Sequence, residues 1–563
     1  MADSTFKCLV ISDFNIDLLA GSLKNDDSDP KVEATVAPFG NVMQLLMDKD
    51  HDCWREQFDF AVVWTRPQAV IESFNRILGY EPVPFEKIMD EVVRYADLLL
   101  GLLDRVKAVF VPTWVLPTYD RGLGMLDMKS GLGVANTLIR MNLHLCERLQ
   151  EGGSIYPLNS QKWIEVAGRH AFDPRLWYTG KIAFANQVFL EATKDIKAAW
   201  RGIRGGYRKL IILDLDDTLW GGIVGDIGWE NIRLGGHDYI GEAYLDFQKV
   251  LKNLTRRGIL LGIVSKNEES VALEAIKKHP EMVLKPDDFA GWRINWRDKA
   301  QNIADLLSDL NLGFNAAVFI DDNPVERDRV REALPEVFVP EWPADKMLYK
   351  SALLSLRCFE MPALSEEDLK RTKMYVADRK RKSLGRKIGS LDEWLASLEM
   401  KVEVDKLNRS NLRRAAQLLN KTNQMNLMTR RMTETELMAW AEKADHHLWT
   451  FRVSDKFGDS GLTGIASLAV EGDTGQIIDF ILSCRIIGRK VEETILHTLV
   501  KRARSIKLRE LWACHIPTDK NNPCLRFWKT SGFAEREGAQ NTFWWDLRKD
   551  YPLPSSIRLE DME

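Results

Sequence analysis

Hydrophobic residues along the first 200 positions alternate between short apolar runs and longer amphipathic stretches. The short runs predict strands at Cys8–Ile11, Phe60–Trp64, Ala108–Val111 and Ser154–Pro157. Apolar residues at helical spacing predict helices at Phe85–Val106 and Val134–Gln150. This alternation favours an open α/β domain with a mainly parallel sheet over residues 1–200.

A second α/β unit is predicted over residues 207–360. Three continuous apolar runs there, Leu210–Leu213, Leu260–Val264 and Ala317–Ile320, are typical of parallel strands buried on both faces. Each run ends in polar residues. Because ligands of open α/β sheets bind beyond the carboxyl ends of the strands, chemistry is expected at these ends.

The remaining chain changes character twice. Residues 361–397 are highly charged and lack a long apolar stripe, which predicts a helical linker. Strand-like segments then return around helices over residues 398–550 and predict an α+β domain. The tail from Pro552 onward is expected to be disordered.

Composition agrees with a folded protein of several domains. The chain has 563 residues, 45% hydrophobic and 28% charged, and single cores stop growing beyond roughly 250–300 residues. The net charge of -4 gives no positive field for nucleic acid. No leader pattern and no run of about 20 apolar residues is present, so a cytoplasmic protein without a membrane partner is expected. Seven scattered cysteines without a CxxC pair favour reduced thiols over a zinc site.

The string LIILDLDDTLW places Asp214, Asp216 and Thr218 directly after a predicted buried strand. One carboxylate can attack phosphorus while a second protonates the leaving group and later activates water. Such a cluster also suits Mg²⁺, a hard cation that prefers oxygen ligands. The alternative is a loop that caps a helix, since Asp and Thr are common at helix starts.

The following strands favour the catalytic interpretation. One ends at Ser265, followed by Lys266 and Asn267, and Ser265 is expected to bind a phosphoryl oxygen. Another ends at Asp321 and Asp322, which are expected to complete a metal site with Asp214 and Asp216. Lys299 begins a helix before that strand and is expected to neutralise phosphate and Asp214. Thr218, Ser265, Lys266, Asn267 and Lys299 are the predicted phosphate-binding residues.

These four ordered motifs resemble those of the haloacid dehalogenase superfamily. Only a short stretch separates Leu219 from Arg257, too short for a large cap domain, so the site should be open to a bulky substrate or covered by another domain. The strings DLDDTLWGGIVGD, SKN, WxxKAxNI and IDDNPVER look like the capless subgroup typified by FkbH-like proteins. NKTNQMNL, DKFGDSGLTG and SCRIIGR are similar to the carboxy-terminal part of that family.

The resemblance implies a glyceryltransferase/phosphatase. Such an enzyme takes 1,3-bisphosphoglycerate, removes phosphate and loads the glyceryl group onto the phosphopantetheine thiol of an acyl carrier protein for polyketide-type biosynthesis. One alternative is a phosphatase acting on a sugar phosphate or polysaccharide precursor, with an accessory acetyltransferase domain. A non-catalytic scaffold is another alternative, but it would not need clustered carboxylates.

The predicted third domain contains a candidate acyl-transfer loop. Strand Ile477–Leu482 is followed by Arg485, Gly488 and Arg489 and then by a helix, whose first N–H groups can bind an anion. This resembles the pyrophosphate loop of GNAT acetyltransferases, except that Lys490 stands where Gly or Ala is usual. Carrier-bound pantetheine is therefore expected in preference to free coenzyme A.

Three further features each leave two interpretations. Cys484 is the candidate thiol for a transient thioester, or a small buried residue. The basic stretch Arg379–Lys387 is either a docking site for an acidic carrier protein or a solvated helix face.

Ser12 and Asp13 faintly resemble the start of an SGNH-type hydrolase. His170 and Asp173 occur in the wrong order for its partner motif, so a non-hydrolytic SGNH-like scaffold is expected.

Overall fold

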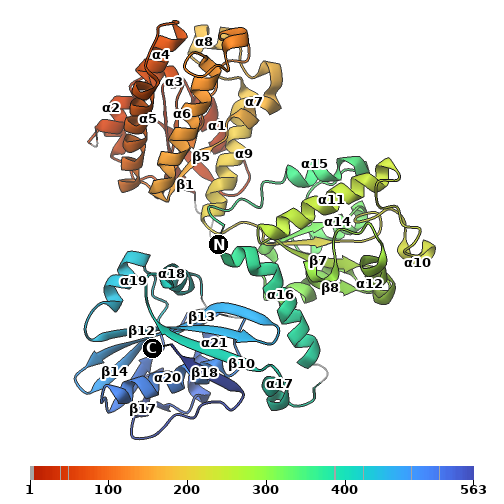
Figure 1. Ribbon diagram of the computed structural model, residues 1–563, viewed down its shortest axis with the longest axis vertical. Helices are drawn as coiled ribbons and strands as arrows, with labels where there is room; N and C mark the ends of the chain where they lie inside the picture. The colour runs from red at the N-terminus through yellow and green to blue at the C-terminus, as the bar shows by residue number, and fades with distance from the viewer. Residues whose placement is uncertain are drawn as a thin grey trace. The chain divides into compact units, whose positions relative to one another are not determined.

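The computed structural model describes residues 5–38, 40–48, 50–364, 366–385, 388–422, 424–483, 485–518 and 520–562 (Figure 1). The chain forms two compact units. The amino-terminal unit comprises Met1–Arg208 with Leu354–Leu364, and the second comprises Lys209–Leu353 with Ser365–Glu563. The described residues form three sheets, one in the amino-terminal unit and two in the second.

The amino-terminal unit is built on a parallel sheet with strand order β2-β1-β3-β4-β5. Its strands are β1 (Phe6–Ser12), β2 (Val32–Val36), β3 (Phe60–Trp64), β4 (Ala108–Pro112) and β5 (Ile155–Leu158). Helices α5 (Phe85–Leu100) and α6 (Val134–Leu149) pack in one core, and α1 (Asp17–Asn25), α7 (Gln161–Ala167) and α9 (Asn186–Ile203) in another. Shorter helices are α2 (Val42–Met47), α3 (Pro67–Val70), α4 (Glu72–Leu78) and α8 (Pro174–Gly180). The predicted parallel α/β architecture is confirmed.

The middle segment, residues 209–353, has a parallel sheet with strand order β8-β7-β6-β9. The strands are β6 (Leu210–Leu213), β7 (Leu260–Ser265), β8 (Phe289–Ile294) and β9 (Ala317–Ile320). Its helices are α10 (Val224–Ile227), α11 (Tyr239–Arg256), α12 (Glu269–Lys278), α13 (Lys299–Leu310), α14 (Pro324–Ala333) and α15 (Tyr349–Leu354). Leu213 pairs in register with Ile263 and Ile320, so the polar residues that follow these strands meet at one edge.

The carboxy-terminal segment, residues 398–562, forms a mostly antiparallel sheet with strand order β16-β17-β15-β14-β13-β12-β10-β18, and β11 pairs with β14. The strands are β10 (Met400–Lys406), β11 (Met425–Asn426), β12 (His446–Asp455), β13 (Gly458–Glu471), β14 (Thr474–Leu482), β15 (Glu510–Cys514), β16 (Ala534–Glu535), β17 (Thr542–Asp546) and β18 (Ile557–Asp561). The helices are α18 (Leu412–Lys421), α19 (Glu434–Ala441), α20 (Val491–Ser505) and α21 (Asn522–Thr530). This is the predicted α+β domain.

The prediction of a disordered tail was wrong. Strand β18 pairs in parallel with β10, with Met400 opposite Ile557 and Val402 opposite Leu559. Ile557 is buried in the core beneath the sheet. The free N–H and C=O groups of the β10 edge therefore order a segment whose composition is mainly polar.

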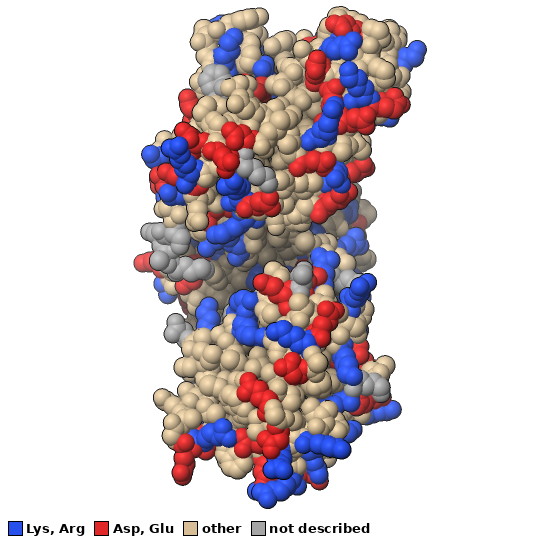
Figure 2. All heavy atoms as spheres, turned by 90° about the vertical axis from the view of Figure 1, so that its left-hand side faces the viewer, with Lys and Arg blue, Asp and Glu red and all other residues tan. Residues whose placement is uncertain are grey.

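The charged segment between the two sheets of the second unit forms helices α16 (Glu366–Gly385) and α17 (Leu391–Ser397). None of the helices in the described part of the chain combines the length and hydrophobicity needed to cross a membrane. Acidic and basic side chains are intermixed on the face shown in Figure 2, in keeping with a net charge close to zero. No large field of one sign is visible on that face.

Candidate active site

Asp214 lies directly after β6 and is nearly buried. Lys299, the first residue of α13, places its Nζ 3.1 Å from Asp214 Oδ1 and 2.6 Å from Asp321 Oδ2. Burial disfavours the charge on Lys299, but Asp214 and Asp321 outweigh it and raise the pKa of the ammonium group. A fixed positive charge thus faces the predicted nucleophile.

A candidate metal site is formed by Asp214, Asp321 and Asp322. One carboxylate oxygen from each lies within 4.8 Å of the others. Three carboxylates of this kind fit Mg²⁺, which is held by oxygen ligands and keeps several waters. Burial first, and the charge of Asp214 second, raise the pKa of Asp321. A cation bound here would favour the ionised carboxylates.

Asp216 is not part of this three-carboxylate group, although it was expected to be a fourth ligand. Its Oδ1 accepts hydrogen bonds from Trp220 Nε1 at 2.9 Å and Val224 N at 3.0 Å, and its Oδ2 accepts one from Asn267 Nδ2 at 2.8 Å. These donors hold the side chain of Asp216 in place. Burial raises the pKa of Asp216, which suits a group that gives and takes a proton.

The predicted phosphate-binding residues fall into two groups. Ser265 and Asn267 are buried at the end of β7, on the edge of the sheet that carries Asp214. Lys266 instead pairs with Glu326 of α14, with Nζ 2.6 Å from Oε1. Thr218 is fully buried, and its hydroxyl oxygen accepts the N–H of Asp322 at 3.1 Å. Thr218 therefore ties the two acidic loops together.

Two further cations at this site were missed by sequence reasoning. Lys346 Nζ lies 3.4 Å from Asp322 Oδ2 and donates to the carbonyl oxygen of Asp217 at 2.9 Å. Arg327 donates from Nη1 to the carbonyl oxygens of Asp321 and Asp322 at 2.8 and 2.7 Å. Arg327 belongs to the IDDNPVER string, which is a signal that could have found it. The segment around Lys346 carries no comparable pattern.

The comparison with solved structures supports this description of the site. The crystal structure of the N-terminal part of the protein BF1531 from Bacteroides fragilis, containing a phosphatase domain complexed with Mg, is 31% identical to this chain. The match covers 64% of this chain and 95% of the other, with a TM-score of 0.58. The chain belongs to the same family as this phosphatase-domain protein. Together with the four motifs, the match identifies the middle segment as a phosphatase domain of the haloacid dehalogenase type.

Other comparisons add little beyond this phosphatase domain. The GNAT domain of S. lividans PAT is 12% identical, over 25% of this chain and 89% of that chain, with a TM-score of 0.21. Rv2747 from Mycobacterium tuberculosis, in complex with CoA and NLQ, is 20% identical over 24% of this chain and 74% of that chain, with a TM-score of 0.20. No family model and no curated protein matches the chain.

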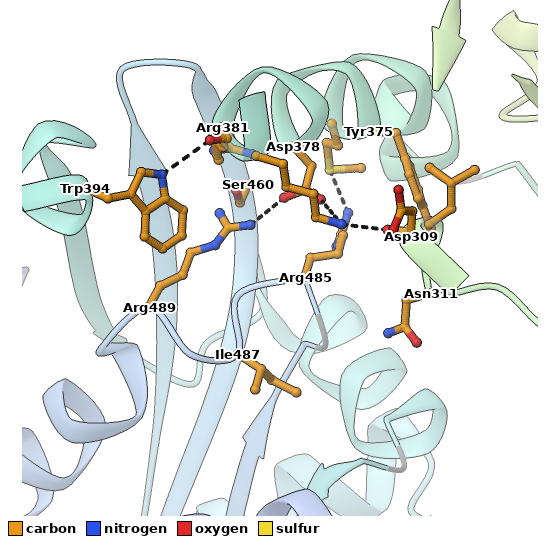
Figure 3. Close-up of a pocket in the computed structure, with 13 residues that line it drawn as sticks. Asp309, Asn311, Tyr375, Asp378, Arg381, Trp394, Ser460, Arg485, Ile487 and Arg489 are labelled. Carbon is orange, nitrogen blue, oxygen red and sulfur yellow. Dashed lines mark hydrogen bonds and ion pairs between the residues drawn. The ribbon is translucent and has the colours of Figure 1, made fainter. Parts of the chain in front are cut away.

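The candidate acyl-transfer loop lies beside α16 and the end of α13 (Figure 3). Arg489 donates to Asp378 of α16 at 2.5 Å, and Arg485 Nη1 lies 2.7 Å from Met374 Sδ. A cavity of about 210 Å³ separates this loop from Asp309 and its neighbours at the end of α13. Both predicted arginines thus face helix α16, while Cys484 lies outside the described residues.

The predicted anion-binding turn is partly filled by the chain itself. The N–H of Gly488 donates to Glu492 Oε1 at 2.6 Å. Burial raises the pKa of the Glu492 carboxyl to about 7. Beside the turn, β14 pairs with β15 only over Thr474–Ile477, and its last residues pair with β11 instead. A coenzyme entering here would have to displace groups of the protein.

The basic stretch of α16 makes contacts on two sides of the helix. Arg379 donates to the carbonyl oxygen of Phe289 at 2.6 Å, and Lys382 to that of Asp309 at 2.6 Å. Arg381 instead pairs with Asp455 of the carboxy-terminal segment. Arg379 and Arg381 are therefore used inside the second unit, while half of the Lys382 side chain stays exposed, as on a solvated helix face. Docking of an acidic carrier protein stays a prediction. Arg386 and Lys387 lie outside the described residues.

In the amino-terminal unit, Ser12 is buried and its hydroxyl oxygen accepts the N–H of Phe14 at 3.2 Å. Asp13 pairs with Arg66, with Oδ2 2.7 Å from Nε. Only 1% of Ser12 is accessible, and its hydroxyl group is hydrogen-bonded within its own loop. This burial favours the predicted non-hydrolytic scaffold.

Proposed function

We propose that the chain is a magnesium-dependent phosphatase coupled to acyl transfer. Its substrate is a phosphorylated three-carbon acyl donor, 1,3-bisphosphoglycerate, and the glyceryl group is loaded onto the phosphopantetheine thiol of an acyl carrier protein. The observation that carries the phosphatase part is the contact of Lys299 with both Asp214 and Asp321, next to the three-carboxylate group. The acceptor and the donor come from the family resemblance of the sequence.

In the phosphatase step, a carboxylate oxygen of Asp214 attacks phosphorus, and the bond to the leaving oxygen breaks. Asp216 gives a proton to that oxygen, then takes one from the water that hydrolyses the aspartyl phosphate. Lys299 offsets negative charge on the nucleophile and the phosphoryl group. Asp214, Asp321 and Asp322 would hold magnesium, which would supply positive charge so that an anionic nucleophile can approach an anionic phosphate.

The acyl-transfer part draws support from the α+β architecture of the carboxy-terminal segment and from Arg485 and Arg489 near the start of α20. Cys484 remains the proposed thiol. A second candidate function is a phosphatase for a sugar phosphate or polysaccharide precursor. The hydrogen bond from Gly488 to Glu492 favours it, because this bond removes one N–H from the proposed ligand site.

The test is intact-mass spectrometry of phosphopantetheinylated carrier proteins incubated with the enzyme, Mg²⁺ and enzymatically generated bisphosphoglycerate. A glyceryl mass increment on the carrier is expected. Asp214→Asn should abolish this increment together with the release of the phosphate that is hydrolysed at the Asp214 site. Asp328→Asn, at an exposed carboxylate on α14, is the matched control and should behave as wild type. Phosphate release without any carrier modification would favour the plain phosphatase.

A further inference from the structure

Three large hydrophobic side chains are exposed in segments that also hold groups of the phosphatase site. Ile223, Trp296 and Val325 keep 53%, 73% and 71% of their surface accessible. In the chain they follow β6, β8 and β9, and Val325 lies in the first turn of α14. Scattered exposed apolar residues are ordinary, but here each belongs to a segment that also positions a catalytic group.

Backbone hydrogen bonds tie the segments of Ile223 and Val325 to the site. Ile223 precedes Val224, whose N–H binds the carboxylate of Asp216. Val325 donates its N–H to Asn323 Oδ1 at 3.0 Å, and the N–H of Asn323 in turn binds Asp321 Oδ1 at 2.9 Å.

Trp296 lies between β8 and Lys299 in the chain. Its preceding residue, Asn295, donates its N–H to the carbonyl oxygen of Ser265 at 3.1 Å. Ile223, Trp296 and Val325 therefore lie in segments that also hold groups of the phosphatase site, and we term these three side chains the apolar rim. A small, fully polar phosphate has no surface to place against it, whereas an organic arm has.

The candidate acyl-transfer loop lies at the other end of the same helix. Lys299 begins α13 at the phosphatase site, and Leu310 ends it at the cavity shared with Arg485 and Arg489. Twelve residues of α-helix span about 18 Å. An acyl group that reacts at both the acyl-transfer loop and the phosphatase site must move over that distance. A flexible tether allows this movement without release of the acyl group from the carrier.

We infer that the phosphatase site acts after acyl transfer, on a phosphorylated acyl group carried as a thioester on the phosphopantetheine arm of the carrier protein. This inference rests on the proposed function. In the first step the acyl group passes, by way of the proposed thioester on Cys484, from the acyl phosphate to the carrier sulfur. Overall, the carrier thiol gives up its proton, a bond forms between its sulfur and the acyl carbon, and inorganic phosphate leaves. In the second step water replaces the remaining phosphate ester through Asp214, giving an alcohol and a second inorganic phosphate. The apolar rim contacts the methylene and methyl groups of the arm during this second step.

The deciding experiment uses the full-length Asp214→Asn protein with bisphosphoglycerate and holo-carrier protein. If transfer comes first, the carrier gains a phosphoglyceryl group, heavier than glyceryl by one phosphate. Wild type with a metal chelator blocks the phosphatase step without a substitution. This reaction should also accumulate the phosphoglyceryl-carrier. The order of steps would be overturned if the carrier stays unmodified in both blocked reactions while untreated wild type yields glyceryl-carrier. The proposed function would still stand in that case. No carrier modification by wild type would overturn both.

The apolar rim has its own test. Trp296→Ala should lower the rate of phosphate release from purified phosphoglyceryl-carrier about 10-fold, as expected when one aromatic contact is lost. Hydrolysis of free 3-phosphoglycerate should be little changed. Tyr119→Ala, at an exposed aromatic residue of the amino-terminal unit, is the control. Equal losses on both substrates, or no loss on the carrier-bound one, would contradict the role of the rim.

Discussion

Arg381 of α16 and Asp455 at the end of β12 form a bidentate ion pair, and their side chains are only 5% and 3% exposed. A buried pair of this kind adds little net stability, but breaking it leaves an uncompensated buried charge. The pair links helix α16 to the sheet of the carboxy-terminal segment. The same helix also contacts the phosphatase domain. The pair is therefore a sensitive point of the second unit.

Arg381→Met should destabilise the protein by about 3–5 kcal/mol, because Asp455 remains buried without its partner. Unfolding in urea, followed by tryptophan fluorescence, measures the change. The double variant Arg381→Met with Asp455→Leu should regain most of the lost stability. If the double variant is as unstable as the single one, charge burial is not the cause.

Asp216→Asn should abolish phosphate release, because asparagine neither gives nor takes the proton. Burial raises the pKa of Asp216 in the folded state, so the wild-type protein loses stability as pH rises from the usual Asp value of about 4 through that raised pKa. The asparagine variant lacks this pH dependence, although its NH₂ group faces donors that bind the carboxylate and lowers stability at every pH. Thermal unfolding should therefore show the midpoint of the variant rising relative to that of wild type between about pH 4 and pH 7. A difference in midpoint that does not change with pH would contradict this account.

Lys346→Met should move the acidic limb of phosphatase activity to higher pH. Burial raises the pKa of Asp322 and Lys346 lowers it, so removal of Lys346 raises it further. Asp322 then becomes protonated, and unable to bind metal, at a higher pH than in wild type. Initial rates at saturating Mg²⁺ across the acidic range measure the shift. Lys350→Met, which removes a half-exposed lysine of α15, should leave the profile in place.

Lys490→Gly should raise stability by about 1 kcal/mol. Lys490 has a φ of 65°, in the left-handed region where a Cβ atom is costly and glycine is not. The Lys490–Glu493 ion pair that is lost lies near the surface and contributes a few tenths of a kcal/mol at most. Comparison with Lys490→Ala separates the two effects, since alanine removes the ion pair but keeps the Cβ. If the Lys490→Gly variant is no more stable than the Lys490→Ala variant, backbone strain at this position is refuted.

Removal of the residues after Pro552 should lower stability by about 2 kcal/mol or more, from the buried side chain of Ile557 and the lost pairing with β10. Urea unfolding of the truncated protein tests this. Ile557→Ser in the full-length chain isolates the apolar contribution and should lose a smaller amount. An unchanged midpoint for the truncated protein would contradict the ordered tail.

Sequence patterns located the strands that are buried on both faces, because such strands are uninterrupted apolar runs. Strand β8 escaped notice because Trp292 and Arg293 are partly exposed and break the run. Strand β18 escaped because polar residues alternate with Ile557 and Leu559, and its order depends on the distant β10.

The site shows the same division. Asp214 and Lys299 were predictable because short motifs mark the ends of strands and the starts of helices. The hydrogen bonds that turn Asp216 toward Trp220 depend instead on the tight turn at Asp217, where φ is 53°. Lys346 reaches Asp322 only through tertiary packing. No local pattern in the sequence encodes that contact.

The contact between Glu492 and the N–H of Gly488 bears on which pantetheine thiol the proposed acyl transfer would use. Free coenzyme A presents a pyrophosphate, and that group would compete with the Glu492 carboxyl for this N–H. A turn that is partly filled by the protein's own side chain would therefore disfavour free coenzyme A.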